Sequence, residues 1–152
     1  MKNIILIFFL LFLYSCGYTS VYKNQKSQDF QINIIKMTGD IEINNLIKNE
    51  LKFYSNRSSN NKYDISINSK YQKIIVSKNS AGVATDYKIS VYTKISINLN
   101  NKNNILNFSE NINIKNNSNS LKQNNYERNI KKNFASSIKN KFIIKIFNLD
   151  DN

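Results

Sequence analysis

Few residues in this chain could carry out chemistry. There is one cysteine, Cys16, and no histidine among the 152 residues. Without histidine, most zinc sites, Ser-His-Asp triads and the usual proton shuttle near neutral pH are ruled out. No glycine-rich phosphate loop or evident carboxylate pair is present. The carboxylates stand singly, for example at Asp64, Asp86, Glu110 and Glu127. The sequence therefore predicts a protein that is not an enzyme and that uses no cofactor or metal.

Basic side chains are the other chemically active group. The chain has Lys+Arg 22 and Asp+Glu 10, a formal net charge of +12. Between Lys115 and Lys145 there are eight basic residues and one acidic residue, Glu127. The whole chain has two arginines, and its 29 asparagines and 24 isoleucines match what AT-rich codons encode. The charge therefore fits either an anionic partner such as lipid phosphate or an ordinary solvated lysine face.

Cys16 stands at the end of an apolar segment. A lysine near the N-terminus is followed by an eleven-residue apolar run, Ile4–Tyr14, and then by Ser15. A helix that spans a membrane needs about 20 apolar residues, so this run is too short to remain as a span. A positive charge, a short apolar run and a small residue are typical of a secretory signal.

Leu13-Tyr14-Ser15-Cys16 resembles the lipobox of bacterial lipoproteins, with Tyr14 where a small or β-branched residue is usual. The resemblance implies a signal peptide over 1–15, lipidation of Cys16 and attachment to a membrane through several acyl chains. Gly17 is not the aspartate that retains many lipoproteins at the inner membrane. The implied location is therefore the periplasmic face of the outer membrane, where nucleic acid is not an expected partner.

The remaining chain divides into a polar tether, 16–29, and a single domain, 30–152. Alternation over Phe30–Ile34 predicts a half-buried strand. Asp40 is placed to cap a helix that ends near Ser55. The apolar face of that helix recurs at steps of three and four residues: Ile43, Leu46, Ile47, Leu51 and Tyr54.

Three alternating stretches follow this helix. The first covers Tyr63–Ile67, and Ile74–Val76 continues or restarts it after a polar interruption at Ser69 and Lys70. The others cover Thr85–Leu99 and Leu106–Ile114. Each has one apolar and one polar face, which is typical of an antiparallel sheet covered on one side. The polar face includes Ser90, Tyr92, Lys94, Ser96, Asn98, Asn107, Ser109, Asn111 and Asn113.

A second helix is predicted at the C-terminus, with an end that the pattern leaves open. Ser120 and Gln123 have the spacing of a capping box. Apolar residues then recur every four positions: Tyr126, Ile130, Phe134, Ile138 and Phe142. The predicted fold is an α+β two-layer sandwich, in which two helices pack on one face of a four-stranded, mostly antiparallel sheet in the order β-α-β-β-β-α.

Cys16-Gly17-Tyr18 resembles the start of the mature lipopolysaccharide-assembly lipoproteins of the LptE family, and the element order is similar too. Ala84–Val91, with its Asp-Tyr pair, resembles the third strand of that family. The resemblance implies a plug inside the β-barrel LptD that helps the barrel to assemble and helps to deliver lipopolysaccharide to the outer leaflet. It also implies lipopolysaccharide binding by Lys78 and Lys122, which match the basic positions of the family.

Other interpretations of the residues remain open. The same anchor and sandwich would suit an auxiliary or pilot lipoprotein of another envelope transport or secretion complex. A binder of polyanions is a third possibility. The polar sheet face could line the wet interior of a large barrel, which is polar in outer-membrane proteins, or could simply face solvent.

Overall fold

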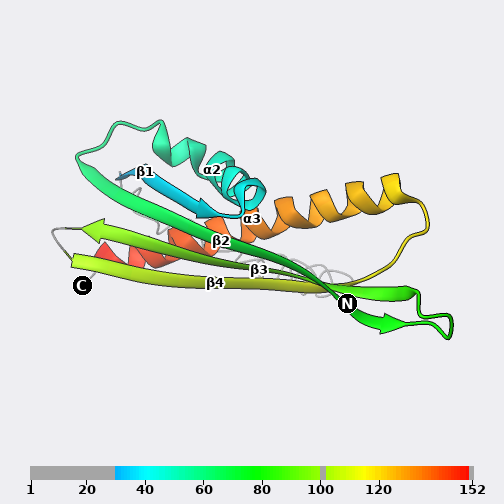
Figure 1. The fold of residues 1–152 in the computed structure, drawn as a ribbon. Coiled ribbons are helices and arrows are strands. Elements are labelled where there is room, and N and C mark those ends of the chain that lie inside the picture. Colours follow the sequence, from blue (N-terminus) through cyan, green and yellow to red (C-terminus); the bar gives the residue numbers. More distant parts are fainter. Residues whose placement is uncertain (1–29, 100–101, 151–152) are drawn as a thin grey trace, which may run out of the picture.

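The computed structural model describes residues 30–99 and 102–150. The predicted signal peptide over 1–15, the predicted lipidation of Cys16 and the predicted tether over 16–29 lie outside the described residues. The elements run in the order β1 (Phe30–Gly39), α2 (Ile41–Ser55), β2 (Asn61–Lys78), β3 (Ala84–Leu99), β4 (Lys102–Lys115) and α3 (Ser120–Asp150). This confirms the predicted order β-α-β-β-β-α and the α+β sandwich (Figure 1).

The four strands lie side by side in the order β1-β2-β3-β4. The first pair is parallel, because α2 carries the chain from the end of β1 back to the start of β2. The β2–β3 and β3–β4 pairs are antiparallel hairpin neighbours. Both helices cover one face of the sheet, and the other face has no layer over it among the described residues (Figure 1).

A close backbone contact fixes the junction between β1 and α2. Gly39 has a φ of 84°, a left-handed conformation that glycine adopts without steric cost. Its position brings the backbone N–H of Asp40 within 2.7 Å of the carbonyl oxygen of Ser69. The Asp40 side chain accepts a hydrogen bond of 2.9 Å from the N–H of Ile43, so the predicted N-cap is confirmed.

The strand β2 runs without a break across the polar residues in its middle. Ser69 and Thr93 are both buried, at 1% and 2% exposed, and their hydroxyl oxygens are 3.0 Å apart in neighbouring strands. Each hydroxyl satisfies the other, so the pair can sit under the helices without the cost of an unpaired polar group. Of the two interpretations open from the sequence, continuation of the strand is the correct one.

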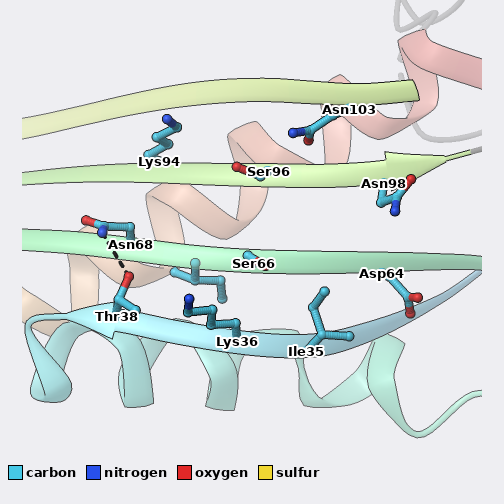
Figure 2. Close-up of a pocket in the computed structure, with 11 residues that line it drawn as sticks. Ile35, Lys36, Thr38, Asp64, Ser66, Asn68, Lys94, Ser96, Asn98 and Asn103 are labelled. Atoms are coloured by element: carbon cyan, nitrogen blue, oxygen red, sulfur yellow. Dashed lines mark hydrogen bonds between the residues drawn. The ribbon is translucent and has the colours of Figure 1, made fainter. Parts of the chain in front are cut away.

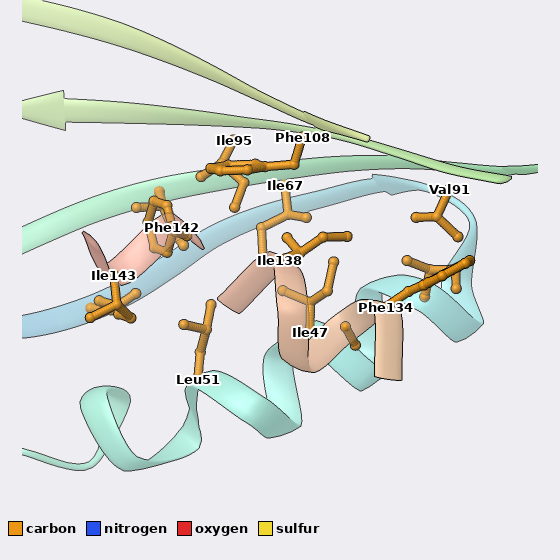
Figure 3. Packing of buried hydrophobic residues seen from close by; sticks show 14 of the residues in the cluster. Ile47, Leu51, Ile67, Val91, Ile95, Phe108, Phe134, Ile138, Phe142 and Ile143 are labelled. Carbon is orange, nitrogen blue, oxygen red and sulfur yellow. The ribbon is translucent and has the colours of Figure 1, made fainter. Parts of the chain in front are cut away.

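The hydrophobic core lies between the sheet and the two helices. In Figure 3, Ile47 and Leu51 of α2 point into it, and Ile67, Ile95 and Phe108 line its sheet side. The predicted four-residue stripe of α3 is buried from Ile130 onward. It supplies Ile130, Phe134, Ile138 and Phe142. Tyr126, at its start, is half exposed.

Three details differ from the sequence-based expectations. The strand β1 reaches Gly39 rather than Ile34, with a bulge at Ile35 that interrupts the alternation. The predicted capping box is wrong, because Asn119 precedes the helix and its side chain accepts from the N–H of Lys122. The side chain of Gln123 accepts instead from the N–H of Asn117.

The end of α3, which the sequence pattern left open, is at Asp150. Ile146 extends the four-residue stripe by one more step and is fully buried. Phe147 packs edge-on against Phe30, with ring centroids 5.7 Å apart. The last turns of α3 therefore close the core over the first residue of β1.

Candidate functional site

The uncovered face of the sheet is one candidate site. Strand register places its side chains in rows that cross the strands. One row contains Lys36, Ser66, Ser96 and Ile105, and the next contains Thr38, Asn68, Lys94 and Asn107. A shallow depression of about 600 Å³ lies over the part of these rows that β1, β2 and β3 supply, and Figure 2 shows Lys36, Thr38, Ser66, Asn68, Lys94 and Ser96 lining it. The short serine and asparagine side chains leave this face smooth.

Hydrogen bonds between strands fix part of this face. The side-chain amide of Asn33 donates to the Asp64 carboxylate at 2.8 Å. The amide of Asn68 donates to the Thr38 hydroxyl, also at 2.8 Å (Figure 2). Hydrogen bonds between neighbouring strands hold these polar side chains in defined positions. A partner would therefore meet a surface that is already ordered.

Positive charge and apolar side chains also lie on the uncovered face. Lys36 and Lys94 line the first depression, and Lys70 and Lys94 line a neighbouring one of about 390 Å³ with Tyr92. Tyr92 and Ile105 are nearly half exposed, and Ile35 is more than half exposed. Exposed apolar side chains among ordered polar groups make this face one candidate for a binding surface.

Alternation in β3 predicts that Tyr92 and Lys94 lie on the polar face, whereas the pattern of β1 does not identify Lys36 and Ile35. The bulge at Ile35 changes the alternation of β1, and no residue type in that segment signals a bulge. Lys70 was assigned to an interruption of the strand instead of to this face. Continuity of β2 could have been inferred only from its pairing with β3.

The projecting end of the β2–β3 hairpin is a second candidate site. Pairing of β1 with β2 ends at Ser69, so the rest of β2 has β3 as its one neighbouring strand among the described residues. Four aliphatic side chains near this end are more than half exposed: Ile74, Ile75, Val76 and Val83. Ile74 pairs with Lys88 and Ile75 with Tyr87, so apolar groups protrude from both faces of the hairpin.

The two lysines assigned by resemblance are both exposed. Lys78 is the last residue of β2, beside the turn toward β3, and Lys122 lies in the first turn of α3. The hairpin end and the start of α3 lie at the same end of the molecule (Figure 1). A single large anionic ligand could therefore reach both lysines, and their role in binding stays a prediction.

A network of charges and rings joins α3 to the β2–β3 hairpin and to α2. Lys73 forms an ion pair with Glu127 and lies 4.2 Å from the centre of the Tyr87 ring. Lys131 forms an ion pair with Glu42 and lies 4.3 Å from the centre of the Tyr71 ring. Such cation–π contacts contribute about 0.5–2 kcal/mol each. The network holds the first turns of α3, which lie beyond the apolar core, against the rest of the domain.

Two pKa shifts follow from this packing. Burial, with the nearby negative charges of Glu127, Glu42 and Asp40, raises the pKa of the Tyr71 hydroxyl to about 12. Burial alone would raise the pKa of the Glu127 carboxyl. Hydrogen bonds from Lys73 and Gln123 and the charge of Lys131 outweigh it and hold that pKa below its usual range. Glu127 is therefore ionised and Tyr71 neutral near pH 7, and neither is poised for proton transfer.

Two further features are absent from the described part of the chain. Within residues 30–99 and 102–150, no cluster of three or more acidic or cysteine side chains could hold a metal ion. Among the same residues, neither helix combines the length and apolar character that crossing a membrane requires.

Comparison with known proteins identifies related folds. No family model and no curated protein sequence matches the chain. Among solved structures, rare lipoprotein B from Shewanella oneidensis matches with a TM-score of 0.56 and 11% identity, over 78% of this chain and 99% of that one. A candidate lipoprotein from Caulobacter crescentus matches with a TM-score of 0.53 and 9% identity, over 75% and 85%. The chain thus has the same α+β sandwich fold as these two structures.

Proposed function

We propose that this protein is an outer-membrane lipoprotein of the LptE type, acylated at Cys16 and held at the periplasmic face. It plugs and helps to assemble an LptD-like β-barrel, and it assists delivery of lipopolysaccharide to the outer leaflet. Lys78 and Lys122 bind the anionic groups of lipopolysaccharide. The protein acts by binding and has no catalytic step.

The observation that carries this proposal is the sandwich fold behind a lipobox-like N-terminus. The fold has the element order that the LptE resemblance implies, and it aligns with nearly the whole of rare lipoprotein B. Both neighbouring structures are named as lipoproteins or candidate lipoproteins. Those names agree with acylation of Cys16, the only cysteine in the chain.

The chemistry of the projecting hairpin supports lipopolysaccharide as the ligand. Lipid A presents phosphates beside acyl chains. Lys78 offers a cation at the hairpin end, and Ile74, Val76 and Val83 offer exposed apolar surface next to it. Cationic groups attract the phosphates even after screening by salt, and burial of apolar side chains against acyl chains adds about 25 cal/mol for each Å².

Depletion of the protein in its own cells tests the proposal directly. We expect less lipopolysaccharide at the cell surface and less correctly folded barrel protein. Affinity purification of the tagged chain in mild detergent should recover a large β-barrel. Recovery of a different envelope complex, with surface lipopolysaccharide unchanged, would instead establish the auxiliary or pilot role.

Substitutions separate the anchor from ligand binding. Cys16→Ser should release the protein from the membrane, and unchanged retention would contradict lipidation. Lys78→Asp with Lys122→Asp should weaken binding of purified lipopolysaccharide while the circular dichroism spectrum is kept. The matched control is Lys48→Asp with Lys132→Asp, which changes the same charge on exposed helix positions. Equal binding by both double variants would remove Lys78 and Lys122 from the site.

A further inference from the structure

The uncovered sheet face carries more positive than negative charge. Lys36, Lys70 and Lys94 lie on it, and its first depression is also lined by one carboxylate, Asp64, which accepts a hydrogen bond from Asn33. Lys70 pairs with Tyr92, so Lys70 and Lys94 are diagonal neighbours, and their Cβ atoms are somewhat less than about 7–8 Å apart. Like charges at this spacing repel weakly in water, and more strongly when a partner excludes the water between them.

The same face combines short side chains with a few protruding apolar ones. Ser66, Ser96 and Ser109 are short, so another surface can approach the sheet closely. Tyr92 and Ile105 protrude from this smooth area, and the bulge in β1 adds Ile35 beside Lys36. An aromatic ring and aliphatic side chains in a polar surround are the arrangement that carries most binding energy in protein interfaces.

The outer surface of the helix layer differs. Its exposed positions are mostly long, flexible side chains, such as Lys48, Lys52, Lys132 and Lys145. Ordering such chains costs up to about 2 kcal/mol of rotamer entropy each, and lysine is depleted at interface centres. Most side chains of the sheet face are short serines and asparagines, and its lysines are few, so less ordering is needed before this face can bind.

We infer that the uncovered sheet face is the surface that docks on the barrel, and that the wall it meets carries carboxylates opposite Lys36, Lys70 and Lys94. Tyr92 and Ile105 are the apolar anchors of this contact. This rests on the proposed function, which supplies a barrel as partner; the polar interior of large outer-membrane barrels suits such a face. Lipopolysaccharide binds elsewhere, at the end that carries Lys78 and Lys122.

Charge reversal in the full-length, membrane-anchored chain tests the inference. The variant is Lys36→Glu, Lys70→Glu and Lys94→Glu together, and the control is Lys48→Glu, Lys132→Glu and Lys145→Glu. Both change the net charge equally at exposed positions. We expect barrel recovery in mild detergent to fall about tenfold or more for the sheet-face variant and to change little for the control. Binding of purified lipopolysaccharide should be the same for both.

A second pair of variants tests the same face without charge. Tyr92→Ala with Ile105→Ala should also lower barrel recovery, whereas Ile41→Ala with Ile144→Ala, at exposed positions of the helices, should not. Both sheet-face variants should keep the wild-type circular dichroism spectrum, because their side chains lie outside the core.

The outcomes separate the inference from the proposed function. If the wild-type chain recovers no barrel, the proposed function fails. If the wild type recovers a barrel and the sheet-face variants recover it equally, or the helix variants lose it to the same extent, the docking face is wrong. Loss of lipopolysaccharide binding, with barrel recovery unchanged, would make this face a lipopolysaccharide site and also overturn the inference.

Discussion

The two halves of β2 both carry large apolar side chains but have different surroundings. In the inner half, Tyr63, Ile65 and Ile67 are almost completely buried under the helices, with β1 and β3 on either side. In the outer half, Ile74 and Ile75 are more than half exposed, and β1 no longer pairs. Alternation therefore determines which face a side chain takes, while burial depends on which other elements reach it.

This contrast separates residues that stabilise the fold from residues available to a partner. Inner-half side chains exchange water for tightly packed neighbours, and their burial stabilises the sandwich. Outer-half aliphatic residues contribute little to that burial, and they form a group instead of standing singly. Grouped apolar residues on a surface are typical of interaction sites. The following substitutions test this division, from the largest expected loss of stability to the smallest.

The two left-handed glycines give the sharpest comparison. A Cβ at position 39 would lie 2.0 Å from the carbonyl oxygen of Ser69, so Gly39→Ala must displace backbone at the inner half. We expect a loss of about 4 kcal/mol or more in the free energy of unfolding. In Gly82→Ala, in the hairpin turn, the added Cβ meets nothing within 4 Å. This variant should lower the free energy of unfolding by only about 1–2 kcal/mol, the cost of the left-handed backbone conformation.

Urea denaturation of both variants measures this difference. Gly82 has a φ of 79°, close to the 84° of Gly39, so the backbone strain is matched and the steric contact is what differs. Equal losses in the two variants would mean that the hairpin turn is packed as tightly as the β1–α2 junction.

Truncation of an isoleucine in each half tests the role of burial. Ile65 is fully buried, and Ile65→Ala should cost about 2–5 kcal/mol through lost contacts and a cavity. Ile75→Ala, at an exposed position of the same strand, should change stability by no more than about 0.5 kcal/mol. A large loss at Ile75 would show that the outer half belongs to the core.

The difference between the halves also shows which structural features the sequence could predict. Alternation and helical spacing were sufficient to predict the element order and the core-facing residues, for example Ile89, Val91, Ile95 and Ile97 in β3. Apolar periodicity reports the chemistry of each side chain. It does not report how far a neighbouring helix or strand extends, so Ile74 and Ile75 could not be distinguished from core residues.

The sequence pattern also could not predict features that depend on local backbone geometry. The bulge at Ile35, which places Lys36 on the uncovered face, and the Asn119 cap each rest on local geometry. Glu110 lies on the face of β4 that is directed toward the core, and its carboxylate accepts hydrogen bonds from the Ser137 hydroxyl and the Lys141 ammonium of α3. Alternation alone predicts an apolar residue at this position.

The pH dependence of stability tests the boundary between the halves. Glu127 has a lowered pKa in the folded state, because it accepts hydrogen bonds from Lys73 and Gln123 despite partial burial. Its contribution to folding is therefore present above the usual glutamate pKa of 4.5 and is lost as the pH falls through the lower folded value.

The substitution Glu127→Gln should flatten this part of the pH profile. At pH 7 it should cost about 0.2–1 kcal/mol, the range for an ion pair near the surface. Chemical denaturation at pH 7 and in steps below pH 4.5 gives the two curves. Profiles that stay parallel across this range would show that the Lys73–Glu127 pair does not fasten α3 to the hairpin.

The smallest expected effect on stability belongs to the exposed hairpin side chains. Ile74→Ser with Val76→Ser should leave the free energy of unfolding within about 0.5 kcal/mol of wild type, because both side chains are already more than half exposed. If the outer half contacts acyl chains, the same double variant should bind lipopolysaccharide more weakly. A truncated ligand that keeps the phosphates but lacks acyl chains should bind both proteins equally. Unchanged binding of intact lipopolysaccharide would mean that the hairpin recognises the phosphates alone, or that the exposed aliphatic side chains serve a different partner.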